Sequence, residues 1–432
     1  MPRSRRGTDT DLTLPRGIRD IEPEEYERHV RVRTAFEEVA GLYNFKVMEP
    51  ASLEHLSTLR AKSGVDIDKE IYAFKDKGGR DLGLRFDLTV GMTRYVCSRR
   101  DLKPPVKLAS FGGMWRYDEP QYGRFRWSHQ WDLEIFGPAS IEADAEVIDA
   151  SAAILRKLGL LDSTVRVGDR RVVENFIRNQ LGVEDDARAI ELMRALDKVG
   201  KKTRPELEKE YFDKGFEKRQ LSSLMELGEI RGHPEAVLGR LSELGLGTAS
   251  QLGDLLDLLK SRGVAKVEYD MSVVRGIDYY TGIVFEAADD RNPRLGSLFG
   301  GGRYDALPKL LGRPDLSATG AAGGVERESM SMGSMTSSAG PFTYVACVAD
   351  MVYPQAQRVL AELRSAGHSS DISQPGRSLS KQLEEASRAG AAWCVIVGEK
   401  ELAAKSVTLR DMRSRKEELL TLAQVLTRLE GS

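Results

Sequence analysis

The chain has 432 residues, 41% of them hydrophobic and 30% charged, a composition that indicates a soluble protein of two or three domains. Its net charge of -2 excludes a uniformly basic surface for nucleic acid but is compatible with a local basic patch. Three cysteines far apart, and no apolar run near the roughly 20 residues of a membrane span, predict a cytoplasmic chain without structural zinc and without a membrane partner.

The first part of the chain predicts one helix followed by short strands. Apolar residues at helical spacing indicate a helix from about 24 to 43. Strand patterns follow at residues 45–50, 82–90, 106–110 and 114–117. In the second of these strands, Arg85, Asp87 and Thr89 would share one face, because successive strand residues point to opposite sides.

Residues 115–137 carry the most informative pattern: a strand, a loop with proline and glycine, and a second strand. From Gln130 onward polar and apolar residues alternate strictly, so that Gln130, Asp132 and Glu134 would lie on one face. The entering strand and the loop carry three arginines, Arg116, Arg124 and Arg126. Guanidiniums beside a row of acceptors would suit a substrate with a phosphate at one end and a cationic or donor-rich group at the other.

Each of these two polar strand faces also has a simpler explanation. A half-buried antiparallel strand often turns its polar side to water without binding anything. That explanation suits most alternating strands taken singly. Two such strands with arginines concentrated between them favour a binding site instead.

The middle of the chain predicts a mostly charged helical segment over residues 165–262, before strand patterns return at 267–274 and 282–288. Arg275 follows the first of these strands in apolar surroundings. It needs a partner there, because an unpaired buried charge is very costly. An internal salt bridge to Asp278 or Glu286 is an equally good explanation of this arginine.

Two glycine-rich segments, 300–305 and 320–327, permit more than one interpretation. The first lacks the Lys-Ser/Thr of a P-loop, and locally it indicates a flexible turn where a backbone or ligand approaches closely. The second could let a neighbouring chain or ligand sit close, or could be a helix C-cap followed by an exposed Arg327. The five histidines form no metal pair at helical spacing and no nucleophile elbow occurs, so hydrolases and metalloenzymes have little support.

Residues 331–340 are small and flexible in composition and predict a linker. Strands then alternate with helices, which implies a compact α/β module of about 90 residues. The predicted strands are 343–348, 369–372, 393–397 and 406–410, and the predicted helices are 355–366, 378–389 and 419–429.

Taken in chain order, these segments resemble the motifs of class II aminoacyl-tRNA synthetases, and among them the histidyl-tRNA synthetase family. The similar segments are 14–20, 84–90, 115–137, 274–282, 300–305 and 324–327. The resemblance covers nearly the whole chain, and 274–282 and 300–305 resemble the two peptides peculiar to histidine enzymes.

This resemblance implies the fold class and the domains. We expect an α+β catalytic domain over residues 1–330, built on a mixed, mainly antiparallel sheet, with the helical insertion at about 165–262. The linker at 331–340 would then lead to a C-terminal α/β anticodon-binding domain at 341–432. The resemblance also implies a homodimer.

The resemblance implies ATP-dependent attachment of L-histidine to its cognate tRNA through a histidyl-adenylate, with Mg²⁺ as a cofactor. The amino acid's carboxylate attacks the α-phosphate of ATP, and such adenylyl transfer depends mostly on positioning and charge stabilisation. Arg116 would hold the α-phosphate, and Arg275 would bridge the substrate carboxylate and that phosphate. Arg124 and Arg327 would grip the outer phosphates.

The histidine-binding residues implied by the resemblance lie on several segments. Asp87, Thr89 and Gln130 would bind the α-amino group of the substrate. Glu134 and Tyr280 would meet the imidazole nitrogens, with Tyr279 beside them. Hydrogen bonds to both nitrogens would let the site reject analogues that lack them.

Two alternatives come from the same resemblance. One is a catalytically silent paralogue such as the regulatory subunit of ATP phosphoribosyltransferase, which typically loses the arginine at position 275 and lacks the anticodon module. The other is a synthetase-like sensor that binds tRNA without charging it, against which the complete set of ATP arginines speaks. Two departures from the family pattern are Asp118, where glutamate is more common, and Glu328, where leucine is expected.

Overall fold

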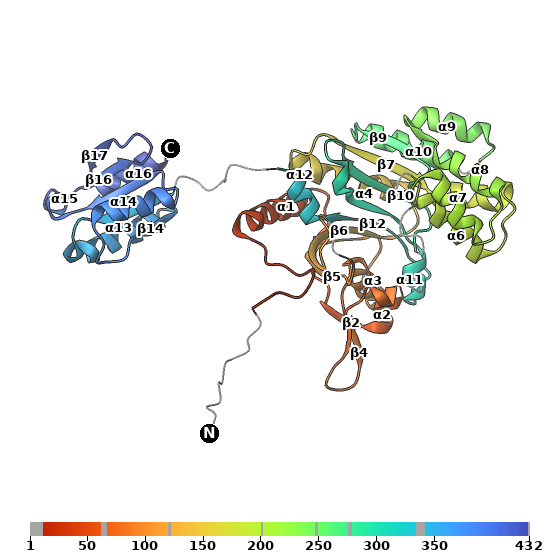
Figure 1. Ribbon diagram of the computed structural model, residues 1–432, viewed down its shortest axis with the longest axis horizontal. Helices are drawn as coiled ribbons and strands as arrows, with labels where there is room; N and C mark the ends of the chain where they lie inside the picture. Colours follow the sequence, from red (N-terminus) through yellow and green to blue (C-terminus); the bar gives the residue numbers. More distant parts are fainter. Residues whose placement is uncertain are drawn as a thin grey trace, which may run out of the picture. The chain divides into compact units, whose positions relative to one another are not determined.

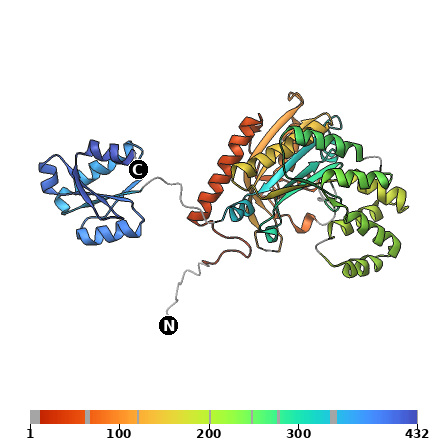
Figure 2. The same ribbon diagram turned by 90° about the horizontal axis from the view of Figure 1, so that it is seen from above.

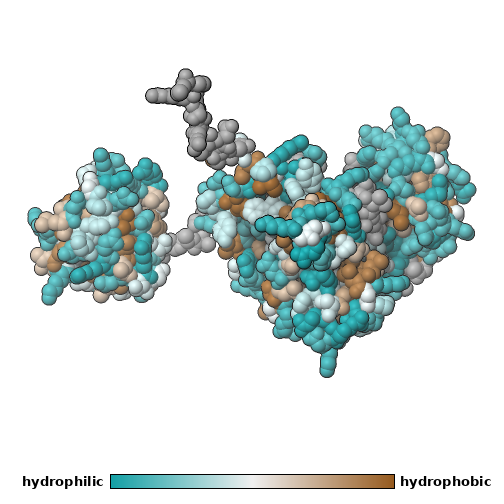
Figure 3. Space-filling model, turned by 90° about the horizontal axis from the view of Figure 1, so that it is seen from below, coloured by the Kyte–Doolittle hydropathy of each residue, from teal (hydrophilic) through white to brown (hydrophobic). Residues whose placement is uncertain are grey.

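The computed structural model describes residues 12–61, 67–119, 122–199, 202–246, 249–274, 279–333 and 342–430. Contacts divide the chain into two compact units, Met1–Gly333 and Ser334–Ser432 (Figures 1 and 2). No helix among the described residues has the length and apolar character to cross a membrane. In the view of Figure 3, hydrophobic residues form only scattered patches on a mostly hydrophilic surface, as is usual for folded proteins in water.

A nine-stranded sheet forms the centre of the first unit (Figure 1). In spatial order its strands are β1 (Lys46–Val47), β5 (Val106–Trp115), β6 (Trp127–Gly137), β12 (Ser317–Gly324), β11 (Ser297–Arg303), β10 (Ile283–Asp289), β7 (Ser163–Asp169), β9 (Val267–Asp270) and β8 (Arg231–Gly232). Only the β1–β5 and β7–β9 pairs are parallel among these neighbours. The predicted mixed, mainly antiparallel sheet is therefore confirmed.

Three helices pack together on one side of this sheet, α1 (Pro23–Leu42), α4 (Ile141–Lys157) and α12 (Val325–Ser331). Figure 2 shows α1, in red, beside the strands. Its buried residues recur at helical spacing and include Val32, Phe36 and Val39. They share one hydrophobic core with Trp131 and Leu133 of β6. Because strand residues alternate, Gln130, Asp132 and Glu134 are left on the opposite face, as predicted.

The predicted strand at 82–90 is wrong in its second half. A three-stranded sheet contains β2 (Leu53–His55), β4 (Asp81–Leu84) and β3 (Ala73–Lys75), beside α2 (Leu56–Arg60) and a 3-10 turn (Ile67–Lys69). The helix α3 (Thr89–Ser98) begins where the strand was expected to continue. Asp87 explains the difference, because its Oδ1 accepts a bond from the Val90 backbone nitrogen at 3.1 Å, a local bond that favours helix starts over strands.

The glycine-rich segments are also strands, which corrects both the predicted turn at 300–305 and the predicted C-cap near 320. Residues 297–303 form β11 and residues 317–324 form β12. The glycines permit close approach, because a Cβ on Gly301 would lie 2.0 Å from the Gly320 carbonyl oxygen. A Cβ on Gly320 would lie 1.6 Å from Glu134 Oε2. Glycine is needed at these two positions because neighbouring groups occupy the space that a Cβ would take.

Residues 170–261 are mainly helical, whereas residues 163–169 form strand β7 and pair with β10. The helices are α5 (Arg170–Asn175), a π-helix (Phe176–Gln180), α6 (Asp186–Asp197), α7 (Arg204–Phe212), α8 (Lys218–Gly228), α9 (Pro234–Glu243) and α10 (Ala249–Ser261). After β10, a 3-10 turn (Pro293–Leu295) precedes β11, and α11 (Ala306–Leu310) follows it.

The second unit is an α/β module, as predicted. Its sheet has the order β14 (Ser370–Ile372), β13 (Thr343–Cys347), β15 (Trp393–Val397), β16 (Val407–Asp411) and β17 (Glu417–Leu420). Its helices are a 3-10 turn (Asp350–Val352), α13 (Tyr353–Ser365), α14 (Leu379–Arg388), α15 (Glu399–Ala403) and α16 (Leu422–Glu430). The sequence prediction missed β17 and α15, and the last helix begins at Leu422 because residues 417–420 pair with β16.

Candidate functional site

A pocket of about 590 Å³ opens in the first unit. All the residues to which the family resemblance gives a role line it except Arg275, which lies outside the described residues. They are Asp87, Thr89, Arg116, Arg124, Gln130, Glu134, Tyr279, Tyr280 and Arg327. Residues far apart in the sequence therefore meet at one place, which supports a shared task for them.

The polar face of β6, which is buried, lines the pocket through Gln130 and Glu134. Gln130 is 6% exposed, Asp132 0% and Glu134 1%, so the interpretation of this face as solvated is wrong. Asp132 fixes two neighbours, because its Oδ1 accepts from Gln130 Nε2 at 2.8 Å and its Oδ2 from Thr89 Oγ1 at 3.0 Å. By accepting these bonds, the Asp132 carboxylate fixes the orientation of the Gln130 amide and the Thr89 hydroxyl.

Glu134 lies against a cluster of tyrosines. The Tyr304 hydroxyl donates a hydrogen bond to Glu134 Oε2. Burial, together with the Glu134 charge, raises the pKa of Tyr304 well above its usual value, so the hydroxyl keeps its proton. The ring centroids of Tyr279 and Tyr304 are 5.2 Å apart, and those of Tyr279 and Tyr280 4.3 Å. The sequence motif at 300–305 drew attention to Tyr304 but gave it no role.

Three guanidiniums, those of Arg116, Arg124 and Arg327, line the same pocket. Arg116 Nε donates to the Phe86 carbonyl at 2.8 Å, and its Nη2 reaches Gln130 Oε1 at 3.3 Å. Arg327 Nη1 donates to the Ser297 carbonyl at 2.9 Å. Bonds of this kind hold the cationic groups in fixed positions, where they can receive a polyphosphate.

The loop arginine Arg124 is held by Asp118, which departs from the family pattern. Its Nε donates to Asp118 Oδ2 at 2.7 Å, and its Nη2 contacts the same oxygen. The shorter aspartate therefore still reaches the arginine. Arg126 behaves differently from the prediction, because it is 8% exposed, donates to the Asp118 carbonyl at 3.0 Å and lies over the Tyr117 ring. It supports the loop and does not line the pocket.

Arg85 is likewise a supporting residue. It is 3% exposed and donates from Nε to the Gly113 carbonyl at 2.7 Å and from Nη2 to Glu49 Oε1 at 3.0 Å. It thus holds β5 and the segment after β1 together beneath the pocket. The predicted common face of Arg85, Asp87 and Thr89 is wrong, although the last two do reach the pocket.

The second departure, Glu328, is buried in α12 with 0% exposure. Trp131 Nε1 lies 3.0 Å from both of its carboxylate oxygens. Burial raises the pKa of Glu328 to about 8, so this side chain is neutral near neutral pH. The charge expected from the sequence at this position is therefore suppressed by its surroundings.

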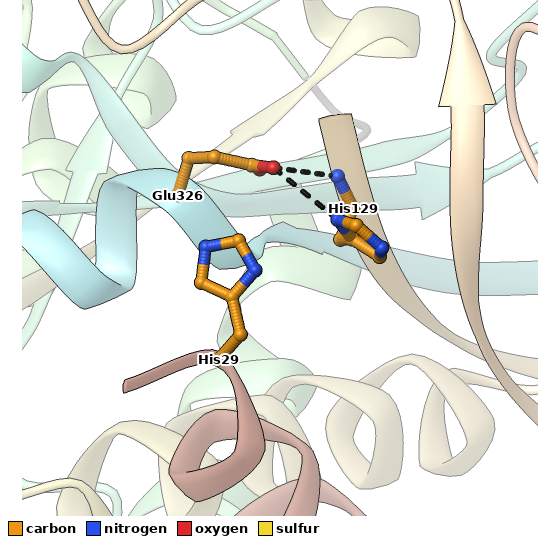
Figure 4. Close-up of side chains that lie close together, drawn as sticks. All are labelled: His29, His129 and Glu326. Atoms are coloured by element: carbon orange, nitrogen blue, oxygen red, sulfur yellow. Dashed lines mark hydrogen bonds and ion pairs between the residues drawn. The ribbon is translucent and has the colours of Figure 1, made fainter. Parts of the chain in front are cut away.

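At the edge of the pocket, His129 and Glu326 meet His29 of α1 (Figure 4). The His129 backbone nitrogen donates to Glu326 Oε1 at 2.8 Å. Sequence reasoning missed this cluster because it searched for histidines at helical spacing, whereas these residues come from three separate elements.

Two family models match the chain. The model described as histidyl-tRNA synthetase matches residues 17–327, and the model described as anticodon binding domain matches residues 343–431. Curated relatives include the histidine–tRNA ligase of Pyrococcus abyssi, 37% identical over 425 residues, which are 96% of this chain and 97% of that relative. The histidine–tRNA ligase of Thermococcus kodakarensis is 38% identical over 416 residues, with 93% and 94% covered.

Solved structures share the fold. The histidyl-tRNA synthetase from Nostoc sp. PCC 7120 superposes with a TM-score of 0.82 at 23% identity, covering 98% of this chain and 99% of that one. A Bacillus halodurans C structure titled as an ATP phosphoribosyltransferase regulatory subunit/histidyl-tRNA synthetase has a TM-score of 0.75 at 24% identity, with 90% and 98% covered.

Proposed function

Since the chain belongs to the histidyl-tRNA synthetase family, we propose that its pocket activates L-histidine with ATP and that the chain transfers the histidine to its cognate tRNA. The observation that carries this proposal is that two chemically different sets of side chains line one pocket. Buried acceptors and tyrosines line it together with three guanidiniums, those of Arg116, Arg124 and Arg327. This arrangement suits an amino acid at one end and a polyphosphate at the other.

At the amino-acid end, Asp87, Thr89 and Gln130 bind the α-ammonium group, with Asp132 holding the last two in place. Glu134 accepts a hydrogen bond from one imidazole nitrogen of the substrate, and Tyr280, with Tyr279 beside it, faces the ring. An analogue without that donor would leave the buried Glu134 carboxylate with an unpaired acceptor, which costs about 1–3 kcal/mol. The site would therefore select histidine over apolar residues of similar size.

At the phosphate end, the carboxylate of histidine attacks the α-phosphorus of ATP and pyrophosphate leaves. The attacking oxygen is already ionised at neutral pH, so this step needs no general base. Arg116 stabilises the charge that develops on the α-phosphate, while Arg124 and Arg327 hold the outer phosphates. We also assign Arg275 to the substrate carboxylate and the α-phosphate, on the strength of the family resemblance alone.

Mg²⁺ is the second proposed partner of ATP. Glu70 lines the same pocket, and a carboxylate oxygen is the ligand type that Mg²⁺ takes together with substrate phosphates. This one carboxylate is compatible with an ion whose other ligands are phosphate oxygens and water, and the ion would neutralise phosphate charge when bound. Glu70 would hold it beside the arginines.

The second unit would bind the anticodon of the tRNA, since its residues 343–431 match the anticodon-binding family. We also propose a cytoplasmic homodimer. Tyr26 and Val30 of α1 support a dimer, because these large hydrophobic side chains are 61% and 45% exposed one helical turn apart.

The silent regulatory paralogue is the weaker alternative. It is expected to lack an anticodon-binding module, whereas this chain matches one. The curated relatives that align over nearly the full length are histidine–tRNA ligases. Both observations favour the enzyme over the binding module.

Histidine-dependent exchange of pyrophosphate into ATP, measured with purified protein, tests the proposal. We expect exchange with histidine and none with phenylalanine or glutamine, and we expect Arg116→Ala to abolish it. Exchange that does not depend on histidine, or that survives Arg116→Ala at the wild-type rate, would refute the assigned chemistry.

A further inference from the structure

Three side chains outside the proposed catalytic set form a cluster of potential metal ligands (Figure 4). They are His29 of α1, His129 of β6 and Glu326 of α12, and one ligand atom from each lies within 4.8 Å of the others. Figure 4 shows the Glu326 carboxylate directed at His129, with the His29 ring beside it. The sheet and two helices therefore bring together residues that are far apart in the sequence.

The cluster contains buried polar atoms whose hydrogen-bonding capacity is unused. His29 is 4% exposed and Glu326 3%. Among the described residues, neither His29 Nε2 nor His129 Nδ1 has a hydrogen-bond partner. A buried polar atom left in this state costs about 1–3 kcal/mol, and a bound ligand would remove that cost at both nitrogens together.

The donor chemistry fits a borderline transition metal. Two imidazoles and one carboxylate are ligands that Zn²⁺ takes in proteins, with a fourth position left for water or substrate. Glu25 Oε1 also lies 3.5 Å from His29 Nε2, but the Arg19 guanidinium contacts both oxygens of that carboxylate, so we do not count Glu25 as a ligand.

The distances are close to those of a tetrahedral site. Zinc bonds of about 2.0–2.1 Å place neighbouring ligand atoms about 3.3 Å apart, and His129 Nδ1 is 3.5 Å from Glu326 Oε1. Glu326 already has a fixed orientation, because its Oε1 accepts from the His129 backbone nitrogen. Only the His29 ring must move closer, and the ring centroids of His29 and His129 are 5.4 Å apart.

We propose that His29, His129 and Glu326 bind a divalent transition-metal ion such as Zn²⁺, with the fourth position open to the pocket that His129 and Glu326 line. The ion would join α1 to β6 and α12 and would stabilise the folded chain by binding it selectively. This site differs from that of Mg²⁺, which prefers oxygen ligands. It does not depend on the proposed catalytic roles.

The test uses the full chain without a histidine tag, freed of metal by a chelator and titrated with Zn²⁺ in excess Mg²⁺ without ATP. We expect one equivalent to bind and the thermal midpoint to rise with Zn²⁺. Co²⁺ in its place should give the visible bands of a tetrahedral site without a thiolate charge-transfer band, which excludes the cysteines. His29→Gln and Glu326→Gln should each weaken binding at least about tenfold, the loss that even an outer-shell change produces.

His233→Gln is the matched control, because His233 is exposed on the insertion and also lies near a carboxylate, Glu235 at 3.9 Å. We expect it to bind Zn²⁺ like wild type. Two results would overturn the site: no saturable binding by the wild-type chain, or wild-type affinity in a folded His29→Gln or Glu326→Gln variant. A Co²⁺ spectrum with thiolate ligation would overturn it as well, and that readout needs no variant.

Discussion

The indole nitrogen of Trp131 lies 3.0 Å from both carboxylate oxygens of Glu328, and both side chains are buried. Trp131 belongs to the apolar face of β6, whose other face lines the pocket through Gln130 and Glu134. Glu328 follows Arg327, which also lines the pocket. The two residues thus join β6 to α12 directly behind the pocket, and their contact accounts for a glutamate where the family resemblance leads us to expect leucine.

Glu328 should make stability depend on pH. The pKa of Glu328 in the folded chain is about 8, above its usual value of 4.5, so between these values the folded state holds a proton that the unfolded state has lost. Stability from this group therefore falls as pH rises through that window. Glu328→Gln removes the titration. We expect the free energy of unfolding of the variant, relative to that of wild type, to rise by on the order of 4 kcal/mol between pH 4.5 and 8. Urea unfolding at a series of pH values measures this, and a constant difference would contradict the assignment.

Tyr304→Phe should weaken histidine binding. The change removes the hydroxyl that donates to Glu134 Oε2, and a hydrogen bond to a charged group contributes about 1.5–3 kcal/mol. We expect kcat/KM for histidine in the exchange assay to fall about 10- to 100-fold, with KM for ATP little changed. Tyr269→Phe is the control, since that buried hydroxyl donates to the Leu252 carbonyl in another part of the unit. An equal effect of both changes would point to a general loss of packing.

Arg124→Ala should act at the opposite end of the pocket. Loss of a charge-assisted contact to an outer phosphate is expected to raise KM for ATP about tenfold or more, while KM for histidine stays near its wild-type value. Arg240→Ala serves as control, because Arg240 is exposed on α9 and pairs with Glu243 at 2.8 Å. A rise in KM for histidine, with KM for ATP unchanged, would contradict the assignment of Arg124 to ATP.

Gly320→Ala should damage the amino-acid end through packing alone. The added Cβ would lie 1.6 Å from Glu134 Oε2 and 2.8 Å from the Leu133 carbonyl oxygen, so Glu134 must move or the strands must separate. We expect a large fall in kcat/KM for histidine and a lower thermal midpoint. Gly239→Ala in α9 meets nothing within 4 Å, and there alanine should raise stability by about 0.5–1 kcal/mol. Wild-type kinetics in Gly320→Ala would show that Glu134 does not need this space.

The pattern of β6 was predictable because side-chain alternation is a property of the strand itself. Gln130, Asp132 and Glu134 lie on one face and Trp131 and Leu133 on the other, as expected. Their burial could not be foreseen, since it depends on neighbours contributed by α3 and β12. Local patterns were also misleading where a single side chain decides the structure, as Asp87 does at the start of α3.

Other parts of the site depend on contacts between distant segments. The glycines of β11 and β12 indicated a flexible turn because their real reason, the space taken by Glu134 and the adjoining strand, lies elsewhere in the sequence. The motif pattern identified Arg116, Arg124 and Arg327 together, whereas spacing alone could not separate them from Arg85 and Arg126. The latter two are distinguished only by their buried protein partners.

Charging of the histidine tRNA is the most direct test of the account. The full chain, incubated with ATP, Mg²⁺, labelled histidine and a transcript of that tRNA, should form aminoacylated tRNA, and the Tyr304→Phe and Arg124→Ala variants should form it more slowly. Folded wild-type protein that binds histidine and the transcript yet forms no histidyl-tRNA would contradict the account and favour the silent paralogue.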